Sequence, residues 1–180
     1  AEDGIRDSVN GLVGSEMCIR DRLGALAHPD YNDPMANSYE QAFATIRALG
    51  LAMAAIEEQF RRAAFNVMAR NQDDNVKNIA FLMDRRGEWS LAPAFDLTYA
   101  YNPAGVWTAR HQMSVDGRRE DITRDDLRAL AATATMKRGR ADAILDQVRS
   151  AVVRWSEFAD AAGVEESQAA GVAVGHRPDL

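Results

Sequence analysis

The sequence lacks several features that mark particular classes of protein. It has a single cysteine, Cys18, which excludes an internal disulfide, and no neighbouring Cys or His residues could build a zinc site with it. Its longest apolar stretches fall well short of the ~20 residues that span a bilayer, and its acidic start lacks the basic and apolar parts of a signal peptide. We therefore expect a soluble, cytoplasmic protein with no membrane association.

Positive charge is also scarce. The 180 residues include 21 Lys and Arg against 27 Asp and Glu, which gives a formal net charge of −6 at pH 7. A wide basic surface is therefore excluded, and direct binding of nucleic acid is not expected, although residues 137–140 form a local basic cluster. Hydrophobic residues make up 47% of the chain, which is enough for one globular domain with a core.

Regular patterning begins at Leu23. Residues 1–22 mix short apolar pieces with Gly and charge, without a helical or strand period. Their run LVGSEMCIRDR resembles translated sequencing-adapter sequence, so we expect either non-native read-through or an irregular leader, and we exclude it from functional reasoning. Residues 164–180 are small, polar and Gly-containing, which predicts a flexible tail. The domain is expected to span residues 23–163.

Helical periodicity dominates this domain. Apolar spacing, capping pairs and terminal glycines predict four helices, near residues 38–49, 53–69, 124–134 and 139–161. Between the second and third helices, the strand-forming stretches 79–83 and 89–92 flank a turn at 84–88, which predicts a β-hairpin. The expected fold class is mainly α (α+β), a helical domain with one central hairpin.

The hairpin brings a metal-binding pair together. Asn78 and Asp96 lie at equal distances along the chain from Gly87, inside the predicted turn, so their side chains should converge. An amide oxygen and a carboxylate suit Mg²⁺, which takes one or two protein oxygens and fills its octahedron with water and phosphate oxygens. We therefore predict that Asn78 and Asp96 are the Mg²⁺ ligands and that the phosphates belong to a bound nucleotide.

Two further residues complete a phosphoryl-transfer site. Asp73 lies five residues before Asn78, on the loop leaving the second helix, where it can accept the proton of a substrate hydroxyl. Lys77 can place its ammonium against the transferring phosphoryl group. A candidate base, an Asn five residues on and an Asp beyond a hairpin have the layout of a kinase site. We predict ATP- and Mg²⁺-dependent phosphoryl transfer, with Asp73 and Lys77 catalytic.

Two stretches also resemble a known family. RNQDDNVKNIAF (residues 70–81) and WSLAPAFDLTYA (89–100) are similar to the HipA-type serine/threonine kinases, which are the toxins of bacterial toxin–antitoxin pairs. The resemblance continues through residues 28–32 and 112–117 and covers roughly residues 23–158. It implies a kinase-like C-terminal lobe whose central hairpin carries the metal ligands.

The resemblance implies the same residue roles as the pattern does. Asp73 would be the catalytic aspartate, Asn78 and Asp96 the Mg²⁺ ligands, and Lys77 a loop residue near the phosphate. The substrate would be a protein phosphorylated on Ser or Thr, with ATP as phosphate donor. The expected partner is a DNA-binding antitoxin.

The chain departs from the family at two points. The family usually has His at the position of Asn75, and Asn can keep one hydrogen bond but cannot become cationic. The residues before Asp73 contain no Gly-x-Gly-x-x-Gly motif and no N-terminal lobe with a lysine that would orient ATP. We therefore expect a truncated C-terminal lobe that is weak or inactive by itself, although its full-length parent is a kinase.

Two other functions stay open at this point. The chain can be a non-catalytic module, either a pseudokinase lobe or an antitoxin-binding helical domain. It can also derive from a small-molecule or lipid kinase, because those enzymes use the same arrangement of Asp, Asn and Asp.

Several neighbouring residues are expected to have structural roles. Asp74 is interpreted as solvent-facing loop polarity, because adjacent residues of an extended loop point apart. His111, a lone histidine without a paired carboxylate, is interpreted as structural. The arginines Arg62 and Arg70 are interpreted as solvated side chains.

Overall fold

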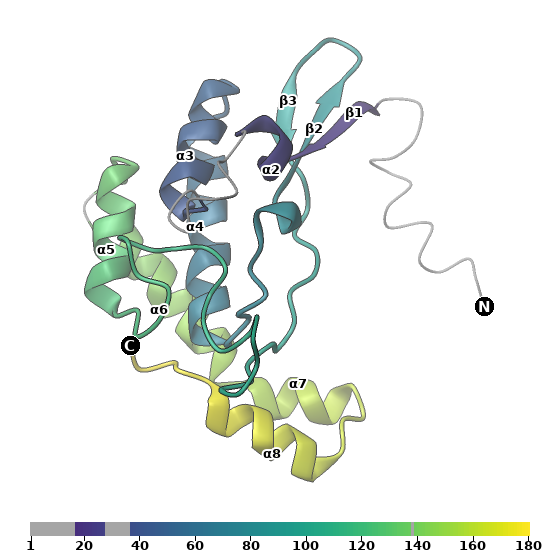
Figure 1. Ribbon diagram of the computed structural model, residues 1–180, viewed down its shortest axis with the longest axis vertical. Helices are drawn as coiled ribbons and strands as arrows, with labels where there is room; N and C mark the ends of the chain where they lie inside the picture. The colour runs from purple at the N-terminus through teal and green to yellow at the C-terminus, as the bar shows by residue number, and fades with distance from the viewer. Residues whose placement is uncertain (1–16, 28–36, 138) are drawn as a thin grey trace, which may run out of the picture.

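The structure is a computed structural model that describes residues 17–27, 37–137 and 139–180. Residues 1–16 and 28–32, on which parts of the sequence interpretation fall, lie outside these ranges. The strands are β1 (Met17–Arg22), β2 (Ala80–Asp84) and β3 (Trp89–Leu91). The helices are α2 (Leu23–Leu26), α3 (Tyr39–Ala48), α4 (Met53–Met68), η1 (Val76–Asn78, a 3₁₀ turn), α5 (Arg124–Thr133), α6 (Arg140–Val152), α7 (Trp155–Ala161) and α8 (Glu166–Gly175). The mainly α class with a small antiparallel sheet is confirmed (Figure 1).

The first two predicted long helices are confirmed and form the centre of the core. The Ser38 side chain accepts a hydrogen bond from the Gln41 backbone N–H at 3.1 Å, so it caps α3 as the sequence indicates. Gly50 follows α3 with a φ of +73°, in the left-handed region that suits a helix C-terminus. Helix α4 then buries a stripe that includes Phe60 and Val67, both fully buried. This buried face holds the C-terminal end of α4, where the candidate site begins.

The predicted hairpin is confirmed. Strands β2 and β3 pair antiparallel, with Phe81 opposite Leu91. Asp84 closes the turn, because its Oδ1 accepts hydrogen bonds from the backbone N–H groups of Arg86 and Glu88 at 2.8 and 2.9 Å. The hairpin therefore projects from the helical core with its open end toward the candidate site (Figure 1).

Residues 17–22 form strand β1, although the sequence predicted an irregular leader up to residue 22. It pairs antiparallel with the outer edge of β2, with Arg22 opposite Ala80, and completes a sheet of order β1-β2-β3. Strand β1 pairs with β2 through backbone N–H and C=O groups at the edge of the sheet, and such pairing depends little on the side chains of β1. The sequence pattern of β1 is therefore weak. The interpretation of residues 1–22 as non-native read-through stays a prediction.

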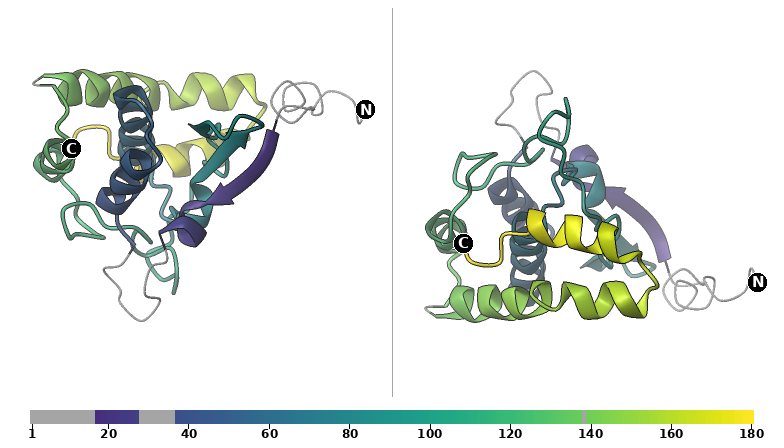
Figure 2. Two further views of the ribbon diagram at one scale, coloured as in Figure 1. Left: turned by 90° about the horizontal axis from the view of Figure 1, so that it is seen from above. Right: turned by 90° about the horizontal axis from the view of Figure 1, so that it is seen from below.

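The C-terminal region differs from the sequence prediction in two ways. The single helix expected over 139–161 is interrupted at Val153–Arg154, because α6 packs on α4 whereas α7 packs on α8 (Figure 2). The tail expected to be flexible contains α8, which runs beside α7 and accepts a hydrogen bond from Trp155 Nε1 at the carbonyl of Ala169, at 2.9 Å. Helix α8 lacks a regular apolar stripe, which is why periodicity missed it.

After α8 the chain returns to the core and contacts the segment that follows the hairpin. The Arg177 backbone N–H donates to the Met68 carbonyl at 2.7 Å, at the end of α4. A Cβ atom at Gly175 would lie 2.1 Å from the Tyr99 hydroxyl oxygen, so any larger residue there would require the Tyr99 side chain to move. The C-terminal segment therefore supports both the end of α4 and the segment after Asp96. None of the described helices is long and apolar enough to cross a membrane.

Candidate active site

The loop that leaves α4 is fixed by its backbone and by one buried amide. Arg70 has a φ of +56°, in the left-handed region, which turns the chain away from the helix axis. The next residue, Asn71, is 1% exposed, and its Nδ2 donates to Asn66 Oδ1 at 3.0 Å and to the Asp96 carbonyl at 3.3 Å. Asn71 therefore joins the end of α4 to the segment that carries Asp96.

Asn78 and Asp96 line the same cleft, although the register of the hairpin is centred on Arg86 and not on Gly87. The cleft has room for about 20 Å³, which suits one ligand the size of a water molecule or a small cation. Asn78 Nδ2 donates to the Asp73 carbonyl at 3.1 Å, and among the described residues no group donates to its Oδ1. The Asn78 amide oxygen and the Asp96 carboxylate are therefore both available to a ligand.

Asp96 has an unusual backbone conformation. Its φ is +57°, in the left-handed region, which costs an ordinary side chain about 1 kcal/mol or more. Such conformations persist only where surrounding contacts hold them, and the Asn71 side chain supplies one such contact at the Asp96 carbonyl. The Asp96 side chain itself is exposed. The backbone conformation that places the Asp96 carboxylate at the cleft therefore lowers the stability of the fold.

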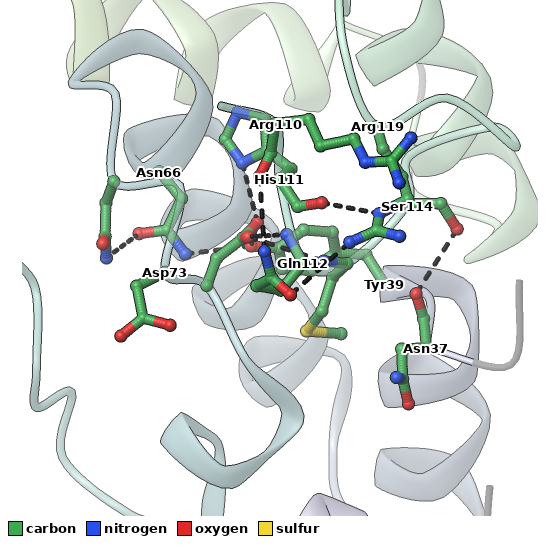
Figure 3. Close-up of polar contacts among 12 residues, drawn as sticks. Asn37, Tyr39, Asn66, Asp73, Arg110, His111, Gln112, Ser114 and Arg119 are labelled. Carbon is green, nitrogen blue, oxygen red and sulfur yellow. Dashed lines mark hydrogen bonds and ion pairs between the residues drawn. The ribbon is translucent and has the colours of Figure 1, made fainter. Parts of the chain in front are cut away.

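The other two predicted site residues occupy different positions. Asp73 is partly exposed, and its carboxylate points away from the buried polar cluster on the other side of the loop (Figure 3). It is joined to Asn78 through its backbone carbonyl but does not line the cleft. Lys77 is exposed and lies outside the cleft as well. Its backbone N–H donates to Asn75 Oδ1 at 3.1 Å, so Asn75 keeps one hydrogen bond in the loop.

Asp74 is not the solvent-facing loop residue that the sequence indicated, because it is 3% exposed and receives four hydrogen bonds. Its Oδ2 lies 2.8 Å from the Tyr39 hydroxyl and 2.9 Å from His111 Nδ1, and its Oδ1 lies 2.7 Å from the Gln112 N–H and 3.4 Å from the Met113 N–H (Figure 3). A carboxylate buried this deeply requires such partners to replace water. Asp74 therefore fixes the segment that contains His111.

His111 has the carboxylate partner that the sequence interpretation did not give it. With the Asp74 carboxylate as acceptor, the imidazole donates this hydrogen bond through Nδ1–H. Asp74 and His111 are separated by 37 residues, so no local spacing could have joined them. The only signal in the sequence was the second aspartate of the Asp-Asp pair.

The cluster around Asp74 is continuous with the segment that carries Asp96. Asn66 Nδ2 donates to the Tyr39 hydroxyl at 2.9 Å, and Asn66 Oδ1 accepts from Asn71, which also contacts the Asp96 carbonyl. Burial, and secondarily the negative charge of Asp74, raises the pKa of Tyr39 well above its ordinary value, so the tyrosine stays a donor. A chain of buried hydrogen bonds thus runs from Asp96 to Asp74.

The residue before Asp73 also holds the segment around His111. With its amide nitrogen turned toward the carbonyl oxygens, Gln72 donates to Thr108 at 2.8 Å and to Ala109 at 3.2 Å, and its oxygen accepts from Arg70 Nη1. Gln72 and Asp74 therefore both face this segment, while Asp73 between them faces the opposite way, as alternate residues of an extended loop do.

Two of the arginines make specific contacts and are not merely solvated. Arg62 donates to the Ala92 carbonyl at 2.9 Å and pairs with Glu58 at 3.0 Å, and its side chain is only 11% exposed. It therefore ties the end of the hairpin to α4. The Arg70 guanidinium lies 4.1 Å from the centre of the Tyr101 ring, a cation–π contact.

The donor set fits a magnesium ion better than a transition metal. Within the described residues, no three His, Cys, Asp or Glu side chains gather into a metal cluster. Mg²⁺ does not need such a cage, because it keeps several waters and takes one or two carboxylate or amide oxygens from the protein. Asn78 and Asp96 supply that set at a cleft of suitable size.

Comparison with protein families identifies the domain. The family model of the HipA-like C-terminal domain matches residues 12–156 of the chain. The chain belongs to the HipA-like C-terminal domain family. The matched range includes β1, which the sequence analysis had set aside, and the whole candidate site. No curated protein matches the chain significantly.

A solved structure of HipA has a similar fold. It is the HipA of Shewanella oneidensis MR-1, solved with HipB and its operator DNA, with a TM-score of 0.58 and 20% sequence identity. The match covers 76% of this chain and 32% of that one, so this chain spans about a third of the length of that HipA. At this identity the likeness shows the fold of the HipA-like domain.

Proposed function

We propose that this HipA-like domain is the catalytic half of a kinase that transfers the γ-phosphate of ATP to a Ser or Thr hydroxyl of a protein. The observation that carries the proposal is the convergence of Asn78 and Asp96 on one cleft, with Asp73 hydrogen-bonded to Asn78 beside it. Family membership favours a protein substrate over the small-molecule or lipid substrates of other kinases.

Asp73 is assigned as the base. Its carboxylate accepts the proton of the substrate hydroxyl while that oxygen bonds to the γ-phosphorus and the bond to the β,γ-bridging oxygen breaks. Lys77 is assigned to the negative charge on the transferring group, which it reaches by turning its exposed side chain. Asn78 and Asp96 would hold Mg²⁺, which when bound neutralises charge on the nucleotide phosphates.

The hydrogen-bonded chain behind the loop supports the same assignment. Phosphoryl transfer depends mainly on positioning and on fixed electrostatics, so its site must be rigid. Asn71 holds the Asp96 segment, and Asp74 and Gln72 hold both flanks of Asp73. These buried contacts restrict the loop without occupying the groups assigned to catalysis.

A non-catalytic role is the second candidate. The cleft admits a ligand the size of one water molecule and not a nucleotide, so ATP would need surfaces beyond the described residues. The HipA of similar fold was solved with HipB and operator DNA, which supports a DNA-binding antitoxin as the partner of the parent protein. In this reading the domain would bind that partner without turnover.

The test separates metal binding from transfer. Mn²⁺, used as a paramagnetic substitute for Mg²⁺, should broaden the backbone NMR signals of Asn78 and Asp96 in this chain, and Asp96→Asn should abolish the effect. In the longer parent protein, Asp73→Asn should abolish γ-phosphate transfer while leaving Mn²⁺ binding intact. An intact parent that transfers no phosphate before the substitution would establish the non-catalytic role instead.

A further inference from the structure

The segment between Gly105 and Arg119 forms a surface that the catalytic assignment does not use. The Gln112 side-chain amide donates to the carbonyls of Trp107 and Arg110, which closes the segment into a turn. Trp107 is 73% exposed and Val106 is 85% exposed, so two large apolar side chains stand in solvent on this turn. Exposed aromatic side chains on a fixed loop are typical of binding surfaces.

Two arginines lie together on the same segment. Arg119 donates through Nε to the His111 carbonyl at 2.6 Å and through Nη2 to Gln112 Oε1 at 3.5 Å, both neutral acceptors. Figure 3 shows the Arg110 and Arg119 side chains directed to the same side of this segment. Burial, and then the positive charge of Arg110, lowers the pKa of Arg119.

The pair lacks a counter-ion in the part of the chain that the structure describes. The ion pairs among residues 17–27, 37–137 and 139–180 include neither Arg110 nor Arg119. The negative charge of Asp74 acts on Arg119 and partly offsets the lowering of its pKa, but this carboxylate already receives hydrogen bonds from four other groups. Two adjacent guanidinium groups without a carboxylate favour an external anion, which they can hold with paired hydrogen bonds.

We propose that Arg110 and Arg119 form an anion subsite that binds a carboxylate or phosphate group carried by the protein substrate, beside the apolar surface of Val106 and Trp107. The choice of a protein as the carrier rests on the proposed function. The neighbouring apolar side chains suit a peptide, and the net charge of −6 opposes a nucleic acid.

The subsite is coupled in position to the catalytic loop. Gln72 and Asp74, on either side of Asp73, hold Thr108, Ala109 and Gln112, so the segment with the arginine pair is fixed relative to the base. An anionic residue bound there would fix the substrate relative to the loop, and the acceptor hydroxyl would have to extend to the opposite side of the loop, where the Asp73 carboxylate points. The subsite therefore selects substrates whose acceptor lies a fixed distance from an acidic or phosphorylated residue.

Inorganic phosphate is the first probe, in an NMR titration of this chain at constant ionic strength without ATP or divalent metal. We expect shifts at the Trp107 indole N–H and at the backbone amides near Arg110 and Arg119. Arg110→Gln should weaken phosphate binding about tenfold, the effect of losing one charge-assisted contact. The control Arg85→Gln, at an exposed arginine of the hairpin turn, should leave it unchanged. Equal binding by wild type and Arg110→Gln would overturn the subsite.

Thermal unfolding gives an independent reading. In chloride, Arg110→Gln should unfold at a slightly higher temperature than wild type, because one of two repelling charges is gone. In phosphate, wild type should gain stability through ligand binding and the variant should not. A phosphate-induced gain of the same size in both proteins would mean a general salt effect and would also overturn the subsite.

Whether the anion is carried by a protein is tested with two peptides that differ in one residue and with a DNA duplex. A Ser-containing peptide with Glu near the acceptor should bind more tightly than the same peptide with Gln, and Arg110→Gln should remove the difference. A DNA duplex that displaces phosphate more effectively than the acidic peptide would overturn the choice of a protein. These binding assays contain no ATP and do not depend on catalysis. If the parent protein binds phosphate at this subsite but transfers no γ-phosphate, the proposed subsite is supported and the proposed kinase function is rejected.

Discussion

Replacement of the buried carboxylate of Asp74 gives the sharpest test of how the loop is held. In Asp74→Ala, the Tyr39 hydroxyl, the His111 Nδ1–H and the Gln112 N–H lose acceptors that lie 2.7 to 2.9 Å away. A buried polar group left unsatisfied costs roughly 1–3 kcal/mol. Water can occupy part of the vacated space, so we expect each of the three groups to cost about 1 kcal/mol, the lower end of this range. The free energy of unfolding should therefore fall by about 3 kcal/mol. That is a large part of the roughly 5–15 kcal/mol that stabilises a typical domain.

The measurement is urea unfolding followed by circular dichroism. Asp74→Asn should cost less than Asp74→Ala, because the amide oxygen can still accept from the Gln112 N–H. The control Asp160→Ala removes an exposed carboxylate of α7 and should change the free energy of unfolding by less than about 0.5 kcal/mol. If Asp74→Ala costs no more than this control, the four hydrogen bonds do not hold the segment and the reasoning is wrong.

Three further outcomes follow from the packing. Gly175→Ala should separate α8 from the Tyr99 side chain, because the new Cβ would lie 2.1 Å from the hydroxyl, and hydrogen exchange of α8 should accelerate. The pKa of Tyr39 is raised in the folded state, so its contribution to the free energy of unfolding is complete below the unfolded pKa near 10.0 and is lost as pH rises toward the folded pKa. Tyr39→Phe should therefore lose less stability at alkaline pH than wild type, as measured by urea unfolding at a series of pH values. Asp96→Gly should raise the free energy of unfolding by about 1 kcal/mol, because glycine adopts a positive φ without strain, while abolishing Mn²⁺ binding.

The sequence predicted those elements whose pattern is local. Helices α3, α4 and α5 have apolar residues at helical spacing. Helices α3 and α5 also begin with capping side chains, and Thr123 with Asp126 forms the expected capping box at α5. The hairpin was predictable because its two strand-forming stretches flank a turn-forming run, and its strands pair with Phe81 opposite Leu91. In each case the deciding residues lie within one element or one turn.

What the sequence did not predict depends on contacts between distant segments. Strand β1 is an edge strand stabilised by backbone pairing to β2, and α8 packs through a few contacts to α7, so neither has a strong pattern of its own. Asp74 and His111 are 37 residues apart and meet only because the loop and the later segment pack together. A polar residue buried by such packing has no signature that distinguishes it from an exposed one.

The site therefore combines two kinds of restraint. Asn78 and Asp96 flank the hairpin and line one cleft, but the backbone of Asp96 has a strained φ that the hairpin alone would not maintain. The chain of hydrogen bonds from the Asp96 carbonyl through Asn71, Asn66 and Tyr39 to Asp74 supplies a restraint, because a change in the Asp96 backbone would break its bond to the buried Asn71. Residues that do not line up with the candidate ligands in sequence therefore help to keep the Asp96 carboxylate at the cleft.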